Sequence, residues 1–139
     1  MKTQKQIAAL TADELNRIVP IIRDGLIARY NKGIRSEKSG KDIITELKRL
    51  NIFLNPARLR KMIHHIVIEG LGVNCVLIAN SKGYIITNDP TMIRSYRESL
   101  QGRINSQIAR LEAIERDFAI IENRRALKLT DILYPDAEK

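Results

Sequence analysis

Apolar residues recur at helical spacing in four stretches of the chain, and one further stretch has an extended pattern. The first helical stretch begins near Thr11, which stands at capping-box spacing from Glu14. It continues to a stop signal at 31–33. Pro20 lies inside this stretch and predicts a kink or a break, because proline lacks a backbone donor and crowds the preceding turn. We therefore expect a kinked helix in the N-terminal segment 1–33, packed on the domain that follows.

Two shorter helical stretches follow, and each begins with a strong capping signal. Ser39 precedes the first stretch, and Asn55 followed by Pro56 begins the second. A tight turn over 51–54 separates them, and the second stretch ends at Gly70. Two helices joined by so short a turn predict a helix-turn-helix.

The pattern changes from helical to extended after Gly72. The segments 75–79 and 84–87 are rich in β-branched and aromatic residues. Between them, Gly83 can adopt the backbone conformation that a short hairpin loop requires. The sequence therefore predicts one β-hairpin.

A long helix is predicted from Pro90, over 90–125, with a tail over 126–139. Its apolar residues recur three or four positions apart, which is typical of a coiled-coil seam with one phase shift. A small domain cannot cover so long a helix, so we expect self-association into a homodimer or a higher oligomer. The alternative is a helix folded back on its own domain. The expected self-association residues are Ile93, Tyr96, Leu100, Ile104, Ile108, Leu111, Ile114, Phe118 and Ile121.

The positive charge of the chain is concentrated in one region. The 139 residues have a net charge of +8, and residues 1–89 hold 15 Lys and Arg against 8 Asp and Glu. Within 32–65 the corresponding counts are 9 and 3. A localised basic field attracts polyanions such as nucleic acid. A solvated face that only keeps the protein soluble is the alternative.

Several functional classes receive no support from the sequence. No apolar run approaches the length of a membrane-spanning helix, and the polar start MKTQKQIAAL does not resemble a signal peptide, so we expect a cytoplasmic protein without membrane contact. The single Cys75 cannot form an intramolecular disulfide, and the adjacent His64 and His65 diverge by about 100° on a helix, which argues against a metal site. Walker, GxSxG and HExxH motifs are absent. We expect a non-enzymatic protein without a cofactor.

The helix predicted after Asn55 divides into two faces when its residues are placed at 100° intervals. Leu59, Met62, Ile63 and Ile66 share one face, and roughly opposite lie Arg58, Lys61 and His65, with Ala57, His64 and Ile68 beside them. A recognition helix needs this division, because one face packs on the core while the other presents donors to the major groove. A surface helix with ordinary solvated charges is the alternative.

The order helix, helix, turn, helix, hairpin is that of a winged helix-turn-helix. The expected fold is therefore mainly α with a small β-hairpin: a winged helix-turn-helix over 34–89, followed by the long coiled-coil-like helix. The expected DNA-binding residues are Lys38, Ser39, Lys41, Asn55, Ala57, Arg58, Lys61, His64, His65, Ser81 and Lys82.

Three short segments carry a family resemblance: Ser-Gly-Lys-Asp-Ile from Ser39, Arg-Leu-Arg-Lys-Met-Ile from Arg58, and Ala-Asn-Ser-Lys-Gly-Tyr-Ile-Ile from Ala79. With the Pro-initiated helix that follows, the run from Ser39 to Leu111 resembles the winged-helix domains of bacteriophage and prophage DNA-binding proteins. The resemblance covers about half of the chain, and the longer helices at both ends depart from it. It implies DNA binding in replication or in transcriptional control.

These observations predict a double-stranded DNA-binding protein, sequence-specific or structure-dependent, that dimerises through its long helix. Its expected role is that of a phage or prophage regulator or replication factor. The alternative is a winged-helix adaptor that binds proteins during phage replication or morphogenesis, because such helical surfaces also serve protein partners.

Overall fold

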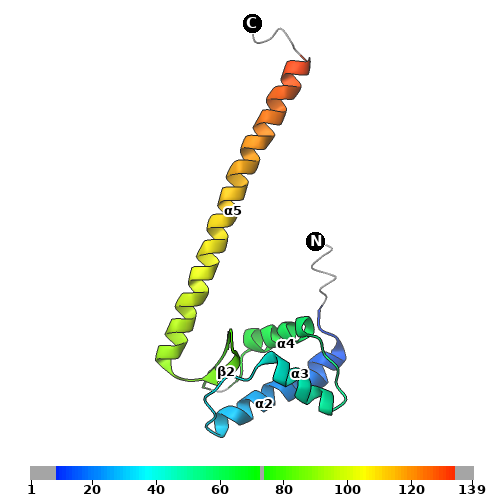
Figure 1. Cartoon of the computed structure of the whole chain (residues 1–139), viewed down its shortest axis with the longest axis vertical. Coiled ribbons are helices and arrows are strands. Elements are labelled where there is room, and N and C mark those ends of the chain that lie inside the picture. Colours follow the sequence, from blue (N-terminus) through cyan, green and yellow to red (C-terminus); the bar gives the residue numbers. More distant parts are fainter. Residues whose placement is uncertain (1–8, 73, 134–139) are drawn as a thin grey trace. The chain divides into compact units, whose positions relative to one another are not determined.

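The computed structural model describes residues 9–72 and 74–133. Residues 1–8 of the expected segment 1–33, and residues 134–139 of the expected tail, lie outside the described part. The described chain is mainly helical, with one antiparallel hairpin and a long C-terminal helix (Figure 1). It divides into two units, Met1–Arg94 and Ser95–Lys139. The predicted mainly α composition with a small hairpin is thus confirmed.

The first helical stretch begins with the predicted capping box. The backbone N–H of Thr11 donates to Oε1 of Glu14 at 2.9 Å, and the N–H of Glu14 donates to Oγ1 of Thr11 at 3.1 Å. A π-helical turn, η1 (Glu14–Ile18), then leads into α2 (Val19–Asn31), with Pro20 in the first turn of α2. The irregularity predicted from Pro20 is therefore a change from π-helical to α-helical winding.

The two capped helices form as predicted. Oγ of Ser39 accepts the N–H of Asp42 at 3.0 Å at the start of α3 (Gly40–Arg49). Oδ1 of Asn55 accepts the N–H of Arg58 at 2.8 Å at the start of α4 (Pro56–Glu69). Each cap satisfies a backbone donor that the first helical turn leaves without an internal partner.

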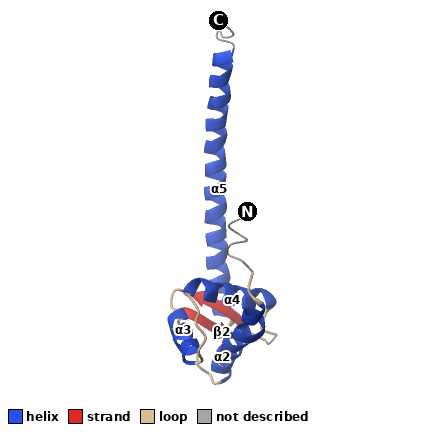
Figure 2. Ribbon diagram, turned by 90° about the vertical axis from the view of Figure 1, so that its right-hand side faces the viewer, coloured by secondary structure: helices blue, strands red, loops and turns tan. Residues whose placement is uncertain are grey.

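The hairpin consists of β1 (Val76–Asn80) and β2 (Gly83–Thr87), joined by a two-residue loop (Figure 2). An isolated bridge joins Lys38 to Tyr84 of β2: the Lys38 N–H donates to the Tyr84 carbonyl at 2.8 Å, and the reverse bond measures 2.9 Å. A Cβ atom at Gly83 would stand 2.3 Å from the Lys38 carbonyl oxygen, so only glycine permits this approach. The segment before α3 is thereby fixed against the hairpin.

The core of the first unit lies between its helices and the hairpin. The predicted stripe of α4 is buried there, which confirms the rotation expected from the sequence. The core cluster contains Ile18, Val19, Ile22, Leu26, Ile43, Leu47, Ile52, Leu59, Met62, Ile63, Ile66, Leu77 and Ile86.

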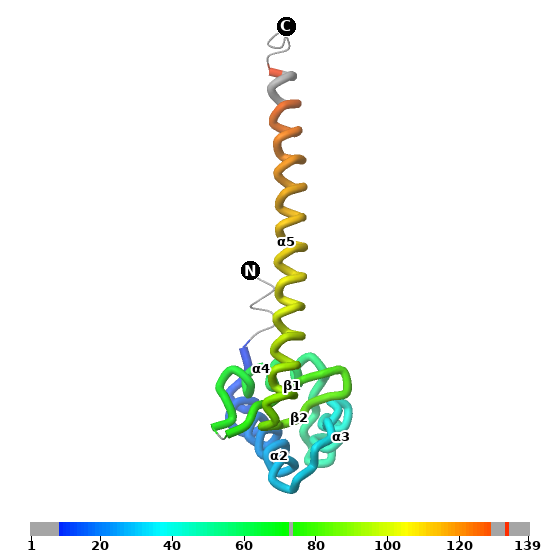
Figure 3. Tube along the Cα trace, turned by 90° about the vertical axis from the view of Figure 1, so that its left-hand side faces the viewer, coloured from blue at the N-terminus to red at the C-terminus, as the bar shows by residue number. Residues whose placement is uncertain are grey.

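The long helix α5 (Pro90–Leu133) spans 44 residues without a break (Figure 3). It is longer than the predicted 90–125, because 126–133 continue the helix where a tail was expected. These residues include good helix formers such as Ala126, Leu127 and Lys128, and no proline occurs before Pro135. No helix in the described part of the chain is both long enough and apolar enough to cross a bilayer.

Candidate nucleic-acid interface

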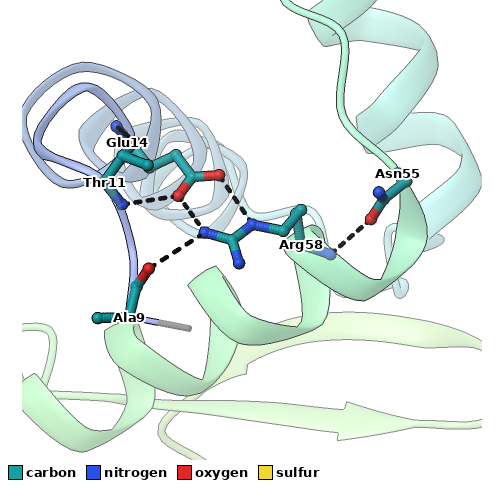
Figure 4. A network of polar contacts seen from close by, with 5 residues as sticks. All are labelled: Ala9, Thr11, Glu14, Asn55 and Arg58. Atoms are coloured by element: carbon teal, nitrogen blue, oxygen red, sulfur yellow. Dashed lines mark hydrogen bonds and ion pairs between the residues drawn. The ribbon is translucent and has the colours of Figure 1, made fainter. Parts of the chain in front are cut away.

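Arg58 does not lie on an open face of α4, contrary to the expectation from the sequence. Its Nε donates to Oε2 of Glu14 at 3.0 Å, and its terminal nitrogen donates to Oε1 of the same carboxylate (Figure 4). The same nitrogen lies 3.5 Å from the carbonyl oxygen of Ala9. The Arg58 and Glu14 side chains are 25% and 12% exposed, so this ion pair is largely shielded from water.

The ion pair also shifts the pKa of both partners. The hydrogen bond from Arg58 holds the pKa of the Glu14 carboxyl below its ordinary value, and the Thr11 N–H contributes in the same direction. The hydrogen bond to Glu14 raises the pKa of Arg58. Arg58 is therefore committed to holding the segment that precedes η1 against α4. Its guanidinium is engaged by Glu14, so it is not open as the sequence predicted.

The flank of α4 beside Arg58 faces the same N-terminal segment. Lys61, His64 and His65 line a shallow hollow of about 330 Å³. The N-terminal segment contributes Ala9, Leu10 and Leu15 to it. Lys61 and His65 are half-buried there, whereas His64 is exposed.

The other flank of α4 carries a cation, Arg60, that is not among the DNA-binding residues predicted from the sequence. Arg60 is exposed and lines a hollow of about 350 Å³ with Lys41 and Thr45 of α3 and with Tyr84 of β2. Within the described chain, neither Arg60 nor Lys41 forms an ion pair with a carboxylate.

Helical spacing was the signal that could have found Arg60. It lies three residues after the exposed Ala57 and four before the exposed His64, so the three share one face. Together with the two α3 residues they form what we call the α3–α4 basic surface: Lys41, Thr45, Ala57, Arg60 and His64.

The remaining predicted DNA-binding residues fall into two groups. Ser39 and Asn55 act as helix caps, and Lys38 forms an ion pair with Glu46 that leaves its side chain 16% exposed. Ser81 and Lys82 are exposed at the tip of the hairpin. The structure thus leaves the tip open but engages the Lys38 ammonium, which was expected to meet DNA.

The hairpin tip is held to the segment before α3. Oδ1 of Asn80 accepts the N–H of Lys82 at 2.8 Å, and Nδ2 of Asn80 donates to Oε2 of Glu37 at 2.9 Å. This hydrogen bond from Asn80 lowers the pKa of the Glu37 carboxyl. An acidic group therefore stands beside the tip and reduces its local positive charge.

The predicted self-association residues lie on α5. From Leu100 to Ile121 their exposed fractions run from 41% to 58%, whereas Ile93 and Tyr96 are half-buried. The single chain leaves most of this apolar seam in contact with water.

Two further groups carry no positive indication of chemistry. Cys75 is half-buried, and burial raises the pKa of its thiol, which disfavours the reactive thiolate. Among the described residues, no three His, Cys, Asp or Glu side chains are grouped so that they could hold a metal ion.

Comparison of the chain with family models, curated proteins and solved structures finds no match.

Proposed function

We propose that this chain is a non-enzymatic winged helix-turn-helix protein that binds double-stranded DNA with α4. The element order α2, α3, α4, β1, β2 supports the proposal. So does the bridge between Lys38 and Tyr84, which pairs the segment between α2 and α3 with the hairpin at a single residue. The hairpin tip at Ser81 and Lys82 then takes the position of the wing.

The α3–α4 basic surface is the observation that carries the proposal. Arg60 of α4 and Lys41 of α3 are both exposed and line the same hollow. Neither has a carboxylate partner among the described residues. Most surface cations are interspersed with acids, so a pair of cations without carboxylate partners among the described residues favours an anionic partner. The small side chain of Ala57 lets α4 approach a groove closely.

Binding would proceed from general attraction to specific contact. The basic surface captures the phosphate backbone, and Arg60 can then donate two hydrogen bonds to a guanine while His64 reaches a neighbouring base edge. Lys41 contacts a phosphate from the adjacent helix. The Arg58–Glu14 ion pair keeps the N-terminal segment beside α4 during this approach.

The biological role that we propose is that of a phage or prophage regulator or replication factor, acting in the cytoplasm. It is supported by the resemblance of residues 39–111 to phage winged-helix domains. Pairing through α5 would carry two DNA-binding units on one assembly, which increases the effective concentration of the second unit after the first has bound.

The test is the salt dependence of binding to a mixed-sequence duplex, measured by fluorescence anisotropy. Arg60→Ala and Lys41→Ala should each reduce the negative slope of log affinity against log salt by about 1. If Arg60 also contacts a base, its loss costs about tenfold or more in affinity for a preferred sequence. Lys32→Ala removes the same charge at the exposed C-cap of α2 and should leave the slope unchanged. Absence of salt-dependent binding by the unaltered protein would refute the proposal.

A second candidate function is that of a protein-binding adaptor. Exposed apolar side chains favour it: Val67 and Ile68 at the end of α4 are 46% and 68% exposed, and Phe53 in the turn before α4 is 72% exposed. Such side chains are typical of partner surfaces when they are close together. Duplex binding that is weak and unaffected by Arg60→Ala would favour this second function.

A further inference from the structure

The part of α5 that carries the apolar seam changes from basic to acidic along its length, before three cations at 124, 125 and 128. The seam residues from Leu100 to Ile121 are about half exposed. Residues 94–110 carry four arginines and one glutamate, whereas 111–123 carry four acidic residues and one arginine. We propose that α5 pairs with the α5 of a second copy of this chain in antiparallel orientation.

Charge complementarity selects this occupant and this orientation. An antiparallel pair centred on the seam places the positive stretch 94–110 of each helix against the acidic stretch 111–123 of the other. A parallel pair in register would place positive on positive and negative on negative along its whole length. Like charges across a helix interface disfavour association, and flanking charges of this kind set the orientation of coiled coils.

The spacing of the seam supports the same pairing. The steps at its start, Ile93 to Tyr96 to Leu100, are three and then four residues, and the steps at its end, from Ile114 through Phe118 to Ile121, are four and then three. The spacing is therefore symmetric about Gln107. When one helix is reversed, the seam residues at its start fall opposite the seam residues at the end of the other helix. The layers formed in this way pair Ile93 with Ile121, Tyr96 with Phe118, and Leu100 with Ile114, each layer occurring twice in the symmetric dimer.

The residues beside the seam are also complementary in this arrangement. Tyr96 and Ile114 occupy heptad position d of the seam. Arg97 and Glu115 come directly after them, at position e, and so lie on the same flank of the helix. In an antiparallel pair these flanks face each other, and Arg97 of one copy meets the second copy's Glu115 at both ends. Near the midpoint, Ile104 of one copy meets Ile108 of the second copy on this flank. This contact explains why the heptad spacing of the apolar residues shifts there.

The orientation fixes the separation of the helix starts. Ile93 of one copy lies next to Ile121 of the second copy, so the two Ile93 residues are about 42 Å apart along the pair at 1.5 Å per residue. A parallel pair would bring them together. This consequence rests on the proposed function: two DNA contacts made by one dimer would be separated and not adjacent.

Disulfide trapping distinguishes the two orientations. The background is the full chain with Cys75→Ser. Leu100→Cys and Ile114→Cys are introduced separately into it, and one of the two variants carries a mass tag. Each variant is oxidised alone and in a mixture with the other. The antiparallel pair predicts the mixed disulfide only, because a disulfide needs Cα atoms within about 7 Å. Disulfides within each single variant would overturn the proposal in favour of a parallel pair. A monomer by sedimentation equilibrium at micromolar concentration would overturn it as well.

Charge exchange tests the flank without introducing thiols. Arg97→Glu should weaken dimerisation several-fold, since two facing pairs become repulsive, and adding Glu115→Arg should restore it. Arg94→Glu changes the same charge away from that flank and should have a smaller effect. Failure of the double exchange to restore the dimer counts against the proposal. Neither assay requires DNA, so a failure here is distinguishable from a failure of DNA binding.

Discussion

The carboxylate of Glu14 accepts two hydrogen bonds from the guanidinium of Arg58, 44 residues further along the chain. The same carboxylate accepts the N–H of Thr11 and thus completes the capping box that starts the first helical stretch. One side chain therefore joins the start of that stretch to the first turn of α4. The placement of the N-terminal segment and the shape of the candidate interface depend on this link.

Loss of the Glu14 charge should destabilise the first unit. Glu14→Gln keeps an oxygen for Thr11 but removes the ionic partner of the shielded Arg58, and we expect a loss of about 1–2 kcal/mol in the free energy of unfolding. Asp13→Asn removes the same charge from the neighbouring residue, whose pair with Arg17 is more than half exposed. That control should cost much less, because solvent screens an exposed pair. Urea denaturation followed by circular dichroism measures both, and equal midpoints would contradict the role assigned to Glu14.

The same ion pair predicts a defined dependence of stability on pH. The pKa of Glu14 is lower in the folded protein than its ordinary value, so the carboxylate form favours the folded state. This contribution is complete above the unfolded pKa, about 4.3 for glutamate, and is lost as the pH falls through the folded pKa. The difference in stability between the unaltered protein and Glu14→Gln should therefore shrink below about pH 5. A difference that grows on acidification would contradict the sign of the shift.

The rotation of α4 can be tested with two adjacent residues. Ile66 is 2% exposed and Val67 is 46% exposed. Ile66→Ala should cost about 2–5 kcal/mol through lost burial and a residual cavity. Val67→Ala should change the free energy of unfolding by no more than about 0.5 kcal/mol. Comparable losses for both variants would mean that α4 is rotated differently.

The close approach at the hairpin makes Gly83 irreplaceable. In Gly83→Ala the new methyl group would collide with the backbone of Lys38, so either the bridge to Tyr84 or the loop must shift. We expect a lower melting temperature and faster exchange of the Lys38 and Tyr84 amides. The matched variant is Gly25→Ala in α2, where a methyl group meets nothing within 4 Å. It should stabilise the protein by about 0.5–1 kcal/mol, because alanine favours a helix interior over glycine.

The core of the first unit does not need α5. Among the residues that the structure describes, none of the core cluster comes from that helix. A chain ended after Arg94 should therefore retain a cooperative thermal transition and sediment as a monomer, since it lacks most of the seam. A truncated chain without cooperative unfolding would show that α5 contributes to the folding of the first unit.

Short-range rules made the secondary structure predictable from the sequence. The caps at Ser39 and Asn55, the proline after Asn55 and the glycine at position 83 each act on neighbours within a few residues. Periodicity likewise identified the buried stripe of α4, because the rotation between residues is fixed by the helix itself. The length of α5 was underestimated because no breaker marks its end before Pro135.

The sequence by itself determined which residues become helices and hairpin, and which side of α4 faces the core. Only the tertiary structure decided that Glu14 engages Arg58, that Glu46 engages Lys38, and that Arg60 stands open beside α3. A helical wheel orders the residues of one helix, but it contains no information about the side chains that another element brings to each flank. The choice between a cation free for DNA and a cation held in an ion pair depends on those long-range neighbours, and they are set by how the helices pack.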